Sequence, residues 1–310
     1  MEQYKEKVLV ILGPTATGKS HCAIEIAKKF NGEIISGDSM LVYREMNIGT
    51  AKPSAEELAA VPHHLVDILP PEASFSVVDF KEQAQRLITE INARGHLPII
   101  AGGTGLYIKA LLEDYAFNSV SENSELREQL TREAELQGAE ALHARLAALD
   151  AVAAERIHPN NVRRVVRALE VYQLTGIPFS RQPSLEKEAP FRYRVAALTM
   201  DRAILYQRIE HRVDQMMAQG LLAEVQTLMR SGISPDCQAM KAIGYKELVP
   251  VVRGETPLDA AVSQLKQNTR HYAKRQLTWM RGEEDVFWAD SLQPESFGLL
   301  DEYFTKGEEA

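Results

Sequence analysis

Residues 13 to 20 have the spacing Gly-x-x-x-x-Gly-Lys-Ser, which can hold the phosphates of a diphosphate or a triphosphate. In such a P-loop the backbone N–H groups turn toward phosphate oxygens, Lys19 adds a positive charge, and the hydroxyl of Ser20 can bind Mg²⁺. An apolar run, Val8 to Leu12, precedes the loop. The helical pattern that follows, Lys19 to Phe30, points its positive end at the same anion. The predicted diphosphate-binding residues are Gly13, Pro14, Thr15, Ala16, Thr17, Gly18, Lys19 and Ser20.

Two further segments follow apolar runs, at the strand ends where parallel α/β sheets bind ligands. Asp38 comes after Gly32 to Ser36, and its carboxylate suits a general base or a partner of Mg²⁺. Its position alone leaves open an Asp that only caps a helix. Thr104 follows Leu97 to Ala101 and the pair Gly102-Gly103, where missing side chains would let the backbone approach a ligand.

The charges along the chain are unevenly distributed. The net charge is −8, but residues 283 to 310 contain nine acids and one lysine, so the rest of the chain is neutral. Two segments there contain bases and no acid: Arg156, Arg163, Arg164 and Arg167 within 156–167, and Lys266, Arg270, Lys274, Arg275 and Arg281 within 260–282. Such patches suit a nucleic-acid backbone. Charge alone leaves open two solvated helix faces.

Composition favours an intracellular enzyme. Apolar stretches are shorter than the roughly 20 residues of a membrane span, and the N-terminus lacks a signal-like apolar segment. Cys22 and Cys237 provide neither a disulfide framework nor zinc-site spacing. We expect a cytoplasmic protein that contacts no membrane, with monomer as the default state.

The order of elements predicts an α/β fold with a parallel sheet, because apolar runs alternate with helical patterns. The strand candidates are Val8 to Leu12, Gly32 to Ser36, His64 to Leu69, Leu97 to Ala101 and Arg194 to Thr199. Later helices are expected over Ala203 to Ser231, Met240 to Arg253 and Leu258 to Arg281.

A long helical segment interrupts this alternation. Residues 118 to 190 contain helical patterns over Ser124 to Asp150 and Asn160 to Thr175, which predict a helical insertion domain. The core domain then comprises 1–117 and 191–282, including the C-terminal basic helices. Residues 283–310 are expected to form an acidic tail that is surface-lying or disordered.

Beyond the P-loop, the chain resembles the tRNA dimethylallyltransferase family through motifs spread between positions 13 and 281. These are Asp38-Ser39 with Val42-Tyr43, Ile48 to Pro53, Gly102-Gly103-Thr104 with Leu106-Tyr107, His158-Pro159-Asn160, Arg167 to Glu170, Thr175-Gly176, Ile243 to Lys246, Lys274-Arg275-Gln276 and Thr278-Trp279. Asn161 stands where the family's pattern has an acid after His-Pro-Asn. If that acid only caps a helix, Asn serves nearly as well; if it orders the nearby arginines, RNA affinity differs.

The resemblance implies a P-loop NTPase-like core whose loop holds dimethylallyl diphosphate with Mg²⁺. The dimethylallyl group would move to N6 of adenosine 37, in tRNAs that read codons beginning with U, and diphosphate would be released. Lys19, Ser20, Thr104 and Arg127 would stabilise the leaving group, and Asp38 would accept the proton of the amine. Arg208 and Arg212 are weaker candidates for the diphosphate.

The same resemblance implies contacts with the tRNA anticodon stem-loop, whose target base must leave its stack. They fall on Asp38, Ser39, Met40, Leu41, Arg163, Arg164, Val165, Val166, Arg167, Lys241, Ala242, Ile243, Gly244, Tyr245, Lys246, Lys274, Arg275, Gln276, Leu277, Thr278, Trp279, Met280 and Arg281.

Three alternatives remain open from the sequence. An adenylate isopentenyltransferase would prenylate free AMP, ADP or ATP with the same core and would not need the basic patches. A P-loop small-molecule kinase would bind ATP but leaves the basic helix with Trp279 unexplained. A non-catalytic nucleic-acid binder leaves Lys19 and Asp38 without a role.

Overall fold

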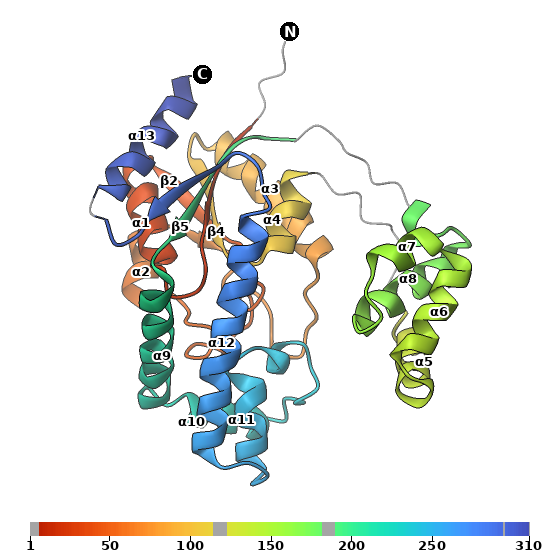
Figure 1. Cartoon of the computed structure of the whole chain (residues 1–310). Coiled ribbons are helices and arrows are strands. Elements are labelled where there is room, and N and C mark those ends of the chain that lie inside the picture. The colour runs from red at the N-terminus through yellow and green to blue at the C-terminus, as the bar shows by residue number, and fades with distance from the viewer. Residues whose placement is uncertain (1–5, 114–122, 182–189, 294, 310) are drawn as a thin grey trace. The chain divides into compact units, whose positions relative to one another are not determined.

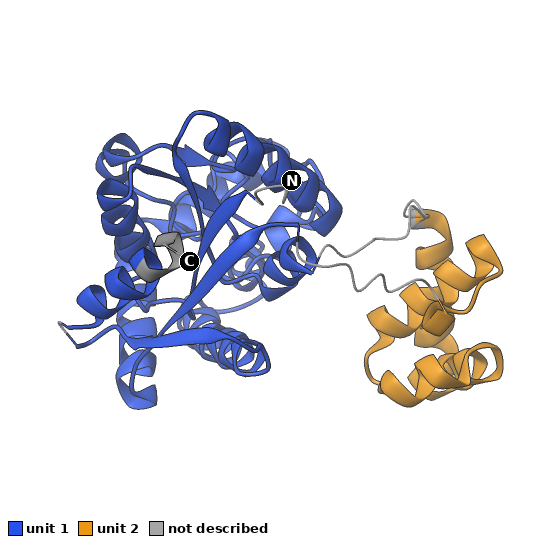
Figure 2. Cartoon of the chain, turned by 90° about the horizontal axis from the view of Figure 1, so that it is seen from above, with its two compact units in different colours: residues 1–114, 187–310 blue, residues 115–186 orange. Residues whose placement is uncertain are grey.

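The computed structural model describes residues 6–113, 123–181, 190–293 and 295–309. The chain divides into two compact units, one formed by Met1–Asp114 with Lys187–Ala310 and the other by Tyr115–Glu186 (Figure 2). We call them unit 1 and unit 2 and describe each by itself. The helices in the described ranges are all too short or too polar to cross a lipid bilayer.

Unit 1 is built on one parallel sheet, which confirms the predicted α/β class (Figure 1). Its spatial order is β3-β2-β4-β1-β5-β6. The strands are β1 Lys7–Leu12, β2 Gly32–Ser36, β3 His63–His64, β4 Leu97–Gly102, β5 Arg192–Thr199 and β6 Val286–Asp290. Helices cover both faces, so most side chains of the two central strands, β4 and β1, are apolar and buried. The carboxyl ends of β1, β2 and β4 therefore lie side by side at one edge.

Two layers of helices bury the sheet. Val8 and Val10 of β1 belong to the larger core, with α3, α4 and helices α9 to α12, whereas Leu9 and Ile11 face a second core with α1 and α13. The helices of unit 1 are α1 Lys19–Lys29, α2 Ala55–Ala60, α3 Val77–Ala93, α4 Gly105–Leu112, α9 Arg202–Ala218, α10 Leu221–Arg230, α11 Tyr245–Val252, α12 Leu258–Met280 and α13 Ser296–Glu309, with a 3-10 turn over Ala239–Lys241.

Unit 2 is a small helical bundle with its own core. It contains α5 Ser124–Gln137, α6 Ala139–Leu149, α7 Ala151–Arg156, α8 Val162–Thr175 and a 3-10 turn over Phe179–Arg181. Leu142, Leu146 and Leu169 are buried at its centre. The single helix predicted over Ser124 to Asp150 is wrong, because Gly138 takes a left-handed φ of 93° and separates α5 from α6.

Three further predicted elements differ in the structure. The strand expected over His64 to Leu69 stops after His64, because Leu65 and Asp67 take left-handed backbone angles that end the pairing. Gly220, with φ 99°, divides the helix predicted over Ala203 to Ser231 into α9 and α10. The helix expected from Met240 begins only at Tyr245.

The prediction of a surface-lying or disordered acidic tail is wrong. β6 pairs in parallel with β5 from Val286 to Asp290, and α13 packs beside α1 (Figure 1). Leu300 and Phe304 are 1% and 0% exposed in the core under α1. The many acids concealed this pattern, because the buried apolar residues are spaced among charges that face water.

Replacing Phe304 with Ala should lower the free energy of unfolding by about 3–5 kcal/mol, because a fully buried aromatic side chain leaves a cavity. Leu299→Ala on the same helix is the matched control, since that side chain is 50% exposed and should cost about 0.5 kcal/mol or less. Urea unfolding curves provide both values. Equal losses for the two variants would contradict a packed α13.

Candidate active site

The P-loop lies between the end of β1 and the start of α1. Ala16 and Gly18 take left-handed φ angles of 68° and 87°, which fold the loop tightly before the first helical turn. Thr17 Oγ1 and Lys19 Nζ donate hydrogen bonds to the Pro14 carbonyl, at 2.8 and 2.9 Å. Because Gly18 begins α1 without a capping side chain, the first N–H groups of the helix are available to an anion.

The loops after β2 and β4 are joined to each other beside the P-loop. Gly37 N donates to Ala101 O at 2.9 Å, and Thr104 N donates to Gly37 O at 3.3 Å. Thr104 Oγ1 accepts from Ser39 N at 3.2 Å. A side chain at Gly102 would lie 2.4 Å from the Gly37 backbone, so the glycine allows two loops to touch. Gly102 also lines the cavity, so the predicted approach of a ligand to this glycine stays a prediction.

Asp38 does not cap a helix. Its Oδ1 accepts a hydrogen bond from Met40 N at 2.8 Å, which forms a turn two residues long. The side chain is half-buried and lines a cavity of unit 1. The turn fixes the orientation of the carboxylate, and Oδ2 remains as the second acceptor.

A cavity of about 1010 Å³ opens over these three strand ends. Thr15, Lys19 and Ser20 of the P-loop line it together with Asp38. Its other walls are the loop 47–55, the middle of α9, residues 241–244 with Lys246, and the side of α12 that carries Tyr272 to Gln276. The structure thus brings the predicted phosphate loop and the predicted carboxylate into one cavity.

Two cations sit close together in this cavity. Burial first, and the neighbouring guanidinium of Arg212 second, lower the pKa of Lys19 to about 8, while Asp38 acts in the opposite direction. Burial also lowers the pKa of Arg212, whose Nη1 lies 3.5 Å from Thr15 Oγ1. Arg212 was a weak candidate from the sequence, and the structure places it in the cavity. Arg208, the other weak candidate, is not among the described residues that line it.

Gln276, one of the predicted tRNA contacts, is buried between the P-loop and the end of β4. Its side chain is 5% exposed and enters the site from α12. Oε1 accepts from Thr15 N of the P-loop, and Nε2 donates to Gly103 O, both at 3.0 Å. A Cβ at Gly103 would lie 2.1 Å from Nε2, so Gly103 makes room for this amide. These two contacts account for the burial of Gln276, and its contact with RNA stays a prediction.

Other predicted tRNA contacts are also buried. Val165 and Val166 belong to the core of unit 2, and Tyr245 and Met280 to the larger core of unit 1. These side chains serve packing, and their contact with RNA stays a prediction. Trp279 is half-buried and its ring fills the space above Gly105, where a Cβ would lie 2.3 Å away.

The remaining RNA candidates also stay predictions, and all except Gly244 are exposed or half-buried. Those with exposed side chains are Arg163, Arg164, Lys241, Lys246, Lys274, Arg275, Thr278 and Arg281. Those that are half-buried are Ser39, Met40, Leu41, Arg167, Ala242, Ile243 and Leu277, and Gly244 is buried. Lys241, Ile243 and Lys246 line the cavity beside α12.

The basic segment of α12 is partly neutralised by its neighbour α9. Lys266 pairs with Asp214 at 2.7 Å and Arg270 with Glu210 at 2.5 Å. The sequence showed an acid-free run, but the acids come from another helix. The end of α12 near the cavity, with Lys274 and Arg275, is the part that presents exposed charge.

Arg127 lies in unit 2, where it is organised by Glu170. Burial alone would raise the pKa of Glu170, but hydrogen bonds from Arg167, the Asn123 N–H and Arg127 hold it below its usual range. The contact of Arg127 with a diphosphate stays a prediction. Asn161 precedes α8, and its carbonyl, not its side chain, accepts hydrogen bonds from the first turn.

The cavity offers few but suitable ligands for Mg²⁺. Ser20 is exposed at the P-loop, and Asp38 lines the same cavity. The described residues contain no cluster of three or more His, Cys, Asp or Glu side chains able to hold a metal. Mg²⁺ commonly binds one or two protein groups and takes the rest of its ligands from substrate phosphates and water. The donor set therefore fits an ion that arrives with a diphosphate.

The comparisons with known proteins agree over almost the whole chain. The family model described as IPP transferase matches residues 41–283. The chain is 53% identical over 295 residues to the tRNA dimethylallyltransferase of Geobacillus thermodenitrificans, covering 95% of this chain and 93% of that one. It is 52% identical over 290 residues to the enzyme of the same name from Bacillus cytotoxicus, with 93% and 92% covered.

Solved structures give the same picture. The full-length tRNA isopentenylpyrophosphate transferase of Bacillus halodurans superposes with a TM-score of 0.75 at 45% identity, covering 98% of this chain and 97% of that one. A eukaryotic dimethylallyltransferase acting on tRNA gives a TM-score of 0.79 at 29% identity, covering 96% of this chain and 77% of that one. These relatives have the P-loop NTPase-like core expected from the sequence.

The lowered pKa of Lys19 predicts how binding of a diphosphate depends on pH. The free protein loses the Lys19 ammonium as pH rises through about 8, so affinity for methyl diphosphate should fall above that pH. The phosphates of this probe are already ionised there. Because the bound anion favours the ammonium, binding near pH 8.5 should take up a fraction of a proton.

Calorimetry in two buffers of different ionisation enthalpy measures that proton uptake directly. Lys19→Met should bind about tenfold more weakly or worse and should show no uptake. A wild-type affinity that is flat between pH 7 and 9.5 would show that Lys19 is not the titrating contact.

Proposed function

The chain belongs to the IPP transferase family, and from this premise we propose that it transfers the dimethylallyl group of dimethylallyl diphosphate to N6 of adenosine 37 in tRNA. The enzyme is a prenyltransferase that modifies tRNA. The observation that carries the proposed chemistry is the single cavity that contains the P-loop, Lys19, Arg212 and Asp38. This cavity contains cations that can stabilise an anionic leaving group and a carboxylate that can accept the proton of an amine.

On the donor side, the cavity stabilises the departing diphosphate. As the bond between C1 of the prenyl group and oxygen breaks, its electron pair stays on the diphosphate, where negative charge grows. The N–H groups at the start of α1, the Lys19 ammonium and the Arg212 guanidinium surround that position. Mg²⁺ held by Ser20 and the diphosphate would neutralise part of this charge.

On the acceptor side, Asp38 serves as the general base. The N6 amine forms its bond to C1 and loses one proton, which Asp38 Oδ2 accepts. The hydrogen bond from Met40 N to Oδ1 holds the carboxylate for this step. Thr104 Oγ1 accepts a hydrogen bond from Ser39 N and so helps to position the loop that carries Asp38. This role is additional to the predicted contact of Thr104 with the diphosphate.

An RNA acceptor is supported by the exposed cations next to the cavity. Lys241 and Lys246 line one wall, and Lys274 and Arg275 lie at the cavity end of α12. They suit the phosphates of an anticodon stem-loop whose target base has left its stack. An enzyme for free AMP, ADP or ATP would not need exposed cations beyond the cavity. Action on tRNA is also a reason to expect a cytoplasmic location; this location and the default state of a monomer stay predictions.

The proposal is tested with purified protein, Mg²⁺ and radiolabelled dimethylallyl diphosphate, offered tRNA for codons beginning with U, free AMP, or no acceptor. Label at adenosine 37 of the tRNA supports the proposal. Label in AMP alone indicates the free-nucleotide enzyme. Turnover of ATP with no label transfer indicates a kinase.

Asp38→Asn should reduce prenyl transfer by about 10²- to 10⁴-fold, because the amide cannot take up the proton. The Asn oxygen can still accept from Met40 N, so the loop keeps its shape. Single-turnover rates measure the loss, and the Kd for tRNA should stay within about twofold. Transfer at nearly the wild-type rate would remove Asp38 from the role of base.

Replacing Lys274 and Arg275 together with Gln should weaken tRNA binding and reduce the slope of log K against log salt by about one to two. The matched control replaces Lys28 and Arg86 with Gln, two exposed cations outside the basic segments. Filter binding between low and moderate salt provides the slopes. An equal slope for both double variants would place the RNA elsewhere.

A further inference from the structure

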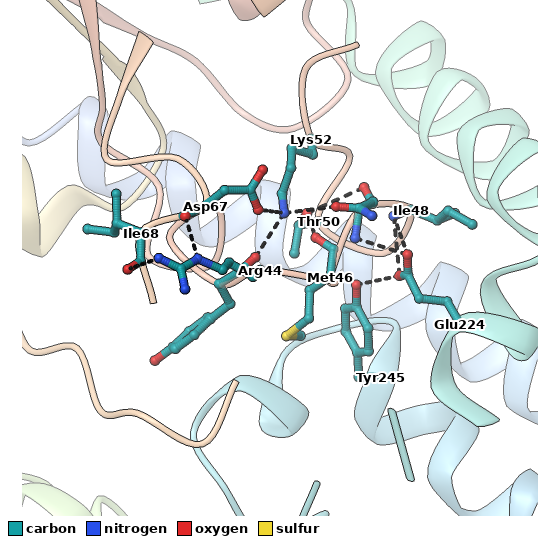
Figure 3. A network of polar contacts seen from close by, with 11 residues as sticks. Arg44, Met46, Ile48, Thr50, Lys52, Asp67, Ile68, Glu224 and Tyr245 are labelled. Carbon is teal, nitrogen blue, oxygen red and sulfur yellow. Dashed lines mark hydrogen bonds and ion pairs between the residues drawn. The ribbon is translucent and has the colours of Figure 1, made fainter. Parts of the chain in front are cut away.

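Two sequence motifs, Ile48 to Pro53 and Ile243 to Lys246, meet at one wall of the cavity. Residues 47–53, here called the wall loop, line the cavity over their whole length. The loop lies between Tyr43 and α2 and has no regular secondary structure that would fix it. Its shape depends on side chains from elsewhere in unit 1, which Figure 3 shows.

Glu224 of α10 holds the start of the wall loop. Its carboxylate accepts hydrogen bonds from the backbone N–H groups of Asn47 at 2.9 Å, Ile48 at 2.9 Å and Gly49 at 3.2 Å (Figure 3). Three successive N–H groups that converge on one carboxylate form a strong, charge-assisted anchor. Such a set also dictates the local backbone, since all three groups must point the same way.

Tyr245 of α11 completes this anchor from below the loop. Its hydroxyl donates to Glu224 Oε1 at 2.6 Å, and the side chain is 0% exposed. Its ring occupies the space beside Gly49, where a Cβ would lie 2.4 Å away. Burial first, and then the Glu224 carboxylate, raise the pKa of Tyr245, which keeps the hydroxyl protonated as a donor.

The rest of the wall loop is held by Lys52. Its Nζ donates to Tyr43 O at 2.8 Å and to Asn47 Oδ1 at 2.9 Å, and it pairs with Asp67. Thr50 Oγ1 donates to Met46 O at 2.6 Å. The loop is therefore fixed at both ends, by Glu224 at one and by Lys52 at the other (Figure 3).

We propose that Glu224 and Tyr245 are positioning residues for prenyl transfer, which hold the wall loop as a fixed side of the reaction cavity. Neither residue lines the cavity itself, so they act through Asn47, Ile48 and Gly49. The inference rests on the proposed function, because the cavity is taken as the place of transfer. A displaced wall would misalign the reacting groups, and a shift of about 1 Å can cost about 10²-fold in rate.

The P-loop is held by other contacts, which separates this effect from binding of the leaving group. Thr17, Pro14 and Gln276 fix that loop and do not contact the Glu224 anchor. Loss of the anchor should thus lower kcat and leave the Kd for inorganic diphosphate unchanged. A general loss of structure would change both.

The experiment compares Glu224→Gln, Tyr245→Phe and the double variant in the full chain. Glu90→Gln and Tyr193→Phe are matched controls, since both side chains are outside the cavity and partly exposed. Hydrogen exchange of the amides of residues 47–49, kcat with saturating substrates, and the Kd for inorganic diphosphate are measured for each. Exchange and diphosphate binding require no assumption about the reaction.

We expect exchange at residues 47–49 to rise at least tenfold in Glu224→Gln and less in Tyr245→Phe, with no change in the controls. The kcat of Glu224→Gln should fall about 10²-fold and that of Tyr245→Phe about tenfold. The Kd for inorganic diphosphate should stay within about twofold of the wild-type value in both variants. Because the two residues form one anchor, the double variant should resemble Glu224→Gln alone. Unchanged exchange, or equal losses in kcat and diphosphate affinity, would overturn the inference. Failure of the wild type to prenylate tRNA would refute the proposed function and leave the exchange result standing.

Discussion

The buried amide of Gln276 is the interaction on which the arrangement of the site depends. It accepts from the P-loop at Thr15 N and donates to the end of β4 at Gly103 O. Because Gln276 belongs to α12, this one side chain joins the phosphate loop, the central sheet and the helix that carries the exposed cations. A polar group buried this deeply needs both partners, so the three segments are held in one register.

The glycines after β4 follow from this approach of α12. Gly103 leaves room for the Gln276 amide and Gly105 for the Trp279 ring, while Gly102 allows contact with Gly37. Any side chain there would push α12 or the β2 loop away from the P-loop. The backbone after β4 therefore contacts α12 closely, and this contact places Arg275 of α12 at the cavity. These glycines therefore allow contacts within the protein, and those contacts in turn determine the shape of the cavity.

The sequence predicted the parts of the site whose signal is local. The spacing of Gly13 to Ser20, the strands that precede Asp38 and Thr104, and the parallel sheet all follow from short patterns of apolar and glycine residues. The roles of Gln276, Glu224 and Tyr245 could not be predicted this way, because their partners lie far away in the chain. Gln276 and Thr15 are separated by 261 residues, and Glu224 lies 176 residues from Ile48. Motif resemblance marked Gln276 and Tyr245 as important, yet without a fold it could only assign them to RNA.

Lys19 and Arg212 carry charges that are unfavourable in the free protein and that would be stabilised by a bound diphosphate. Burial disfavours the charge on both Lys19 and Arg212, and the Arg212 guanidinium further disfavours that on Lys19. Asp38 offsets this only in part, because burial and the Arg212 guanidinium have larger effects on the pKa of Lys19. A bound diphosphate relieves the repulsion between the cations, but relief that is equal for substrate and transition state would not speed the reaction. In the proposed reaction, acceleration would come from the charge that grows on the diphosphate as the carbon–oxygen bond breaks, because that charge strengthens its attraction to both cations. In the reaction that we propose, the proton of the amine moves to Asp38, which would remove a negative charge near Lys19. The diphosphate would then be the main partner of both cations when its own charge is greatest.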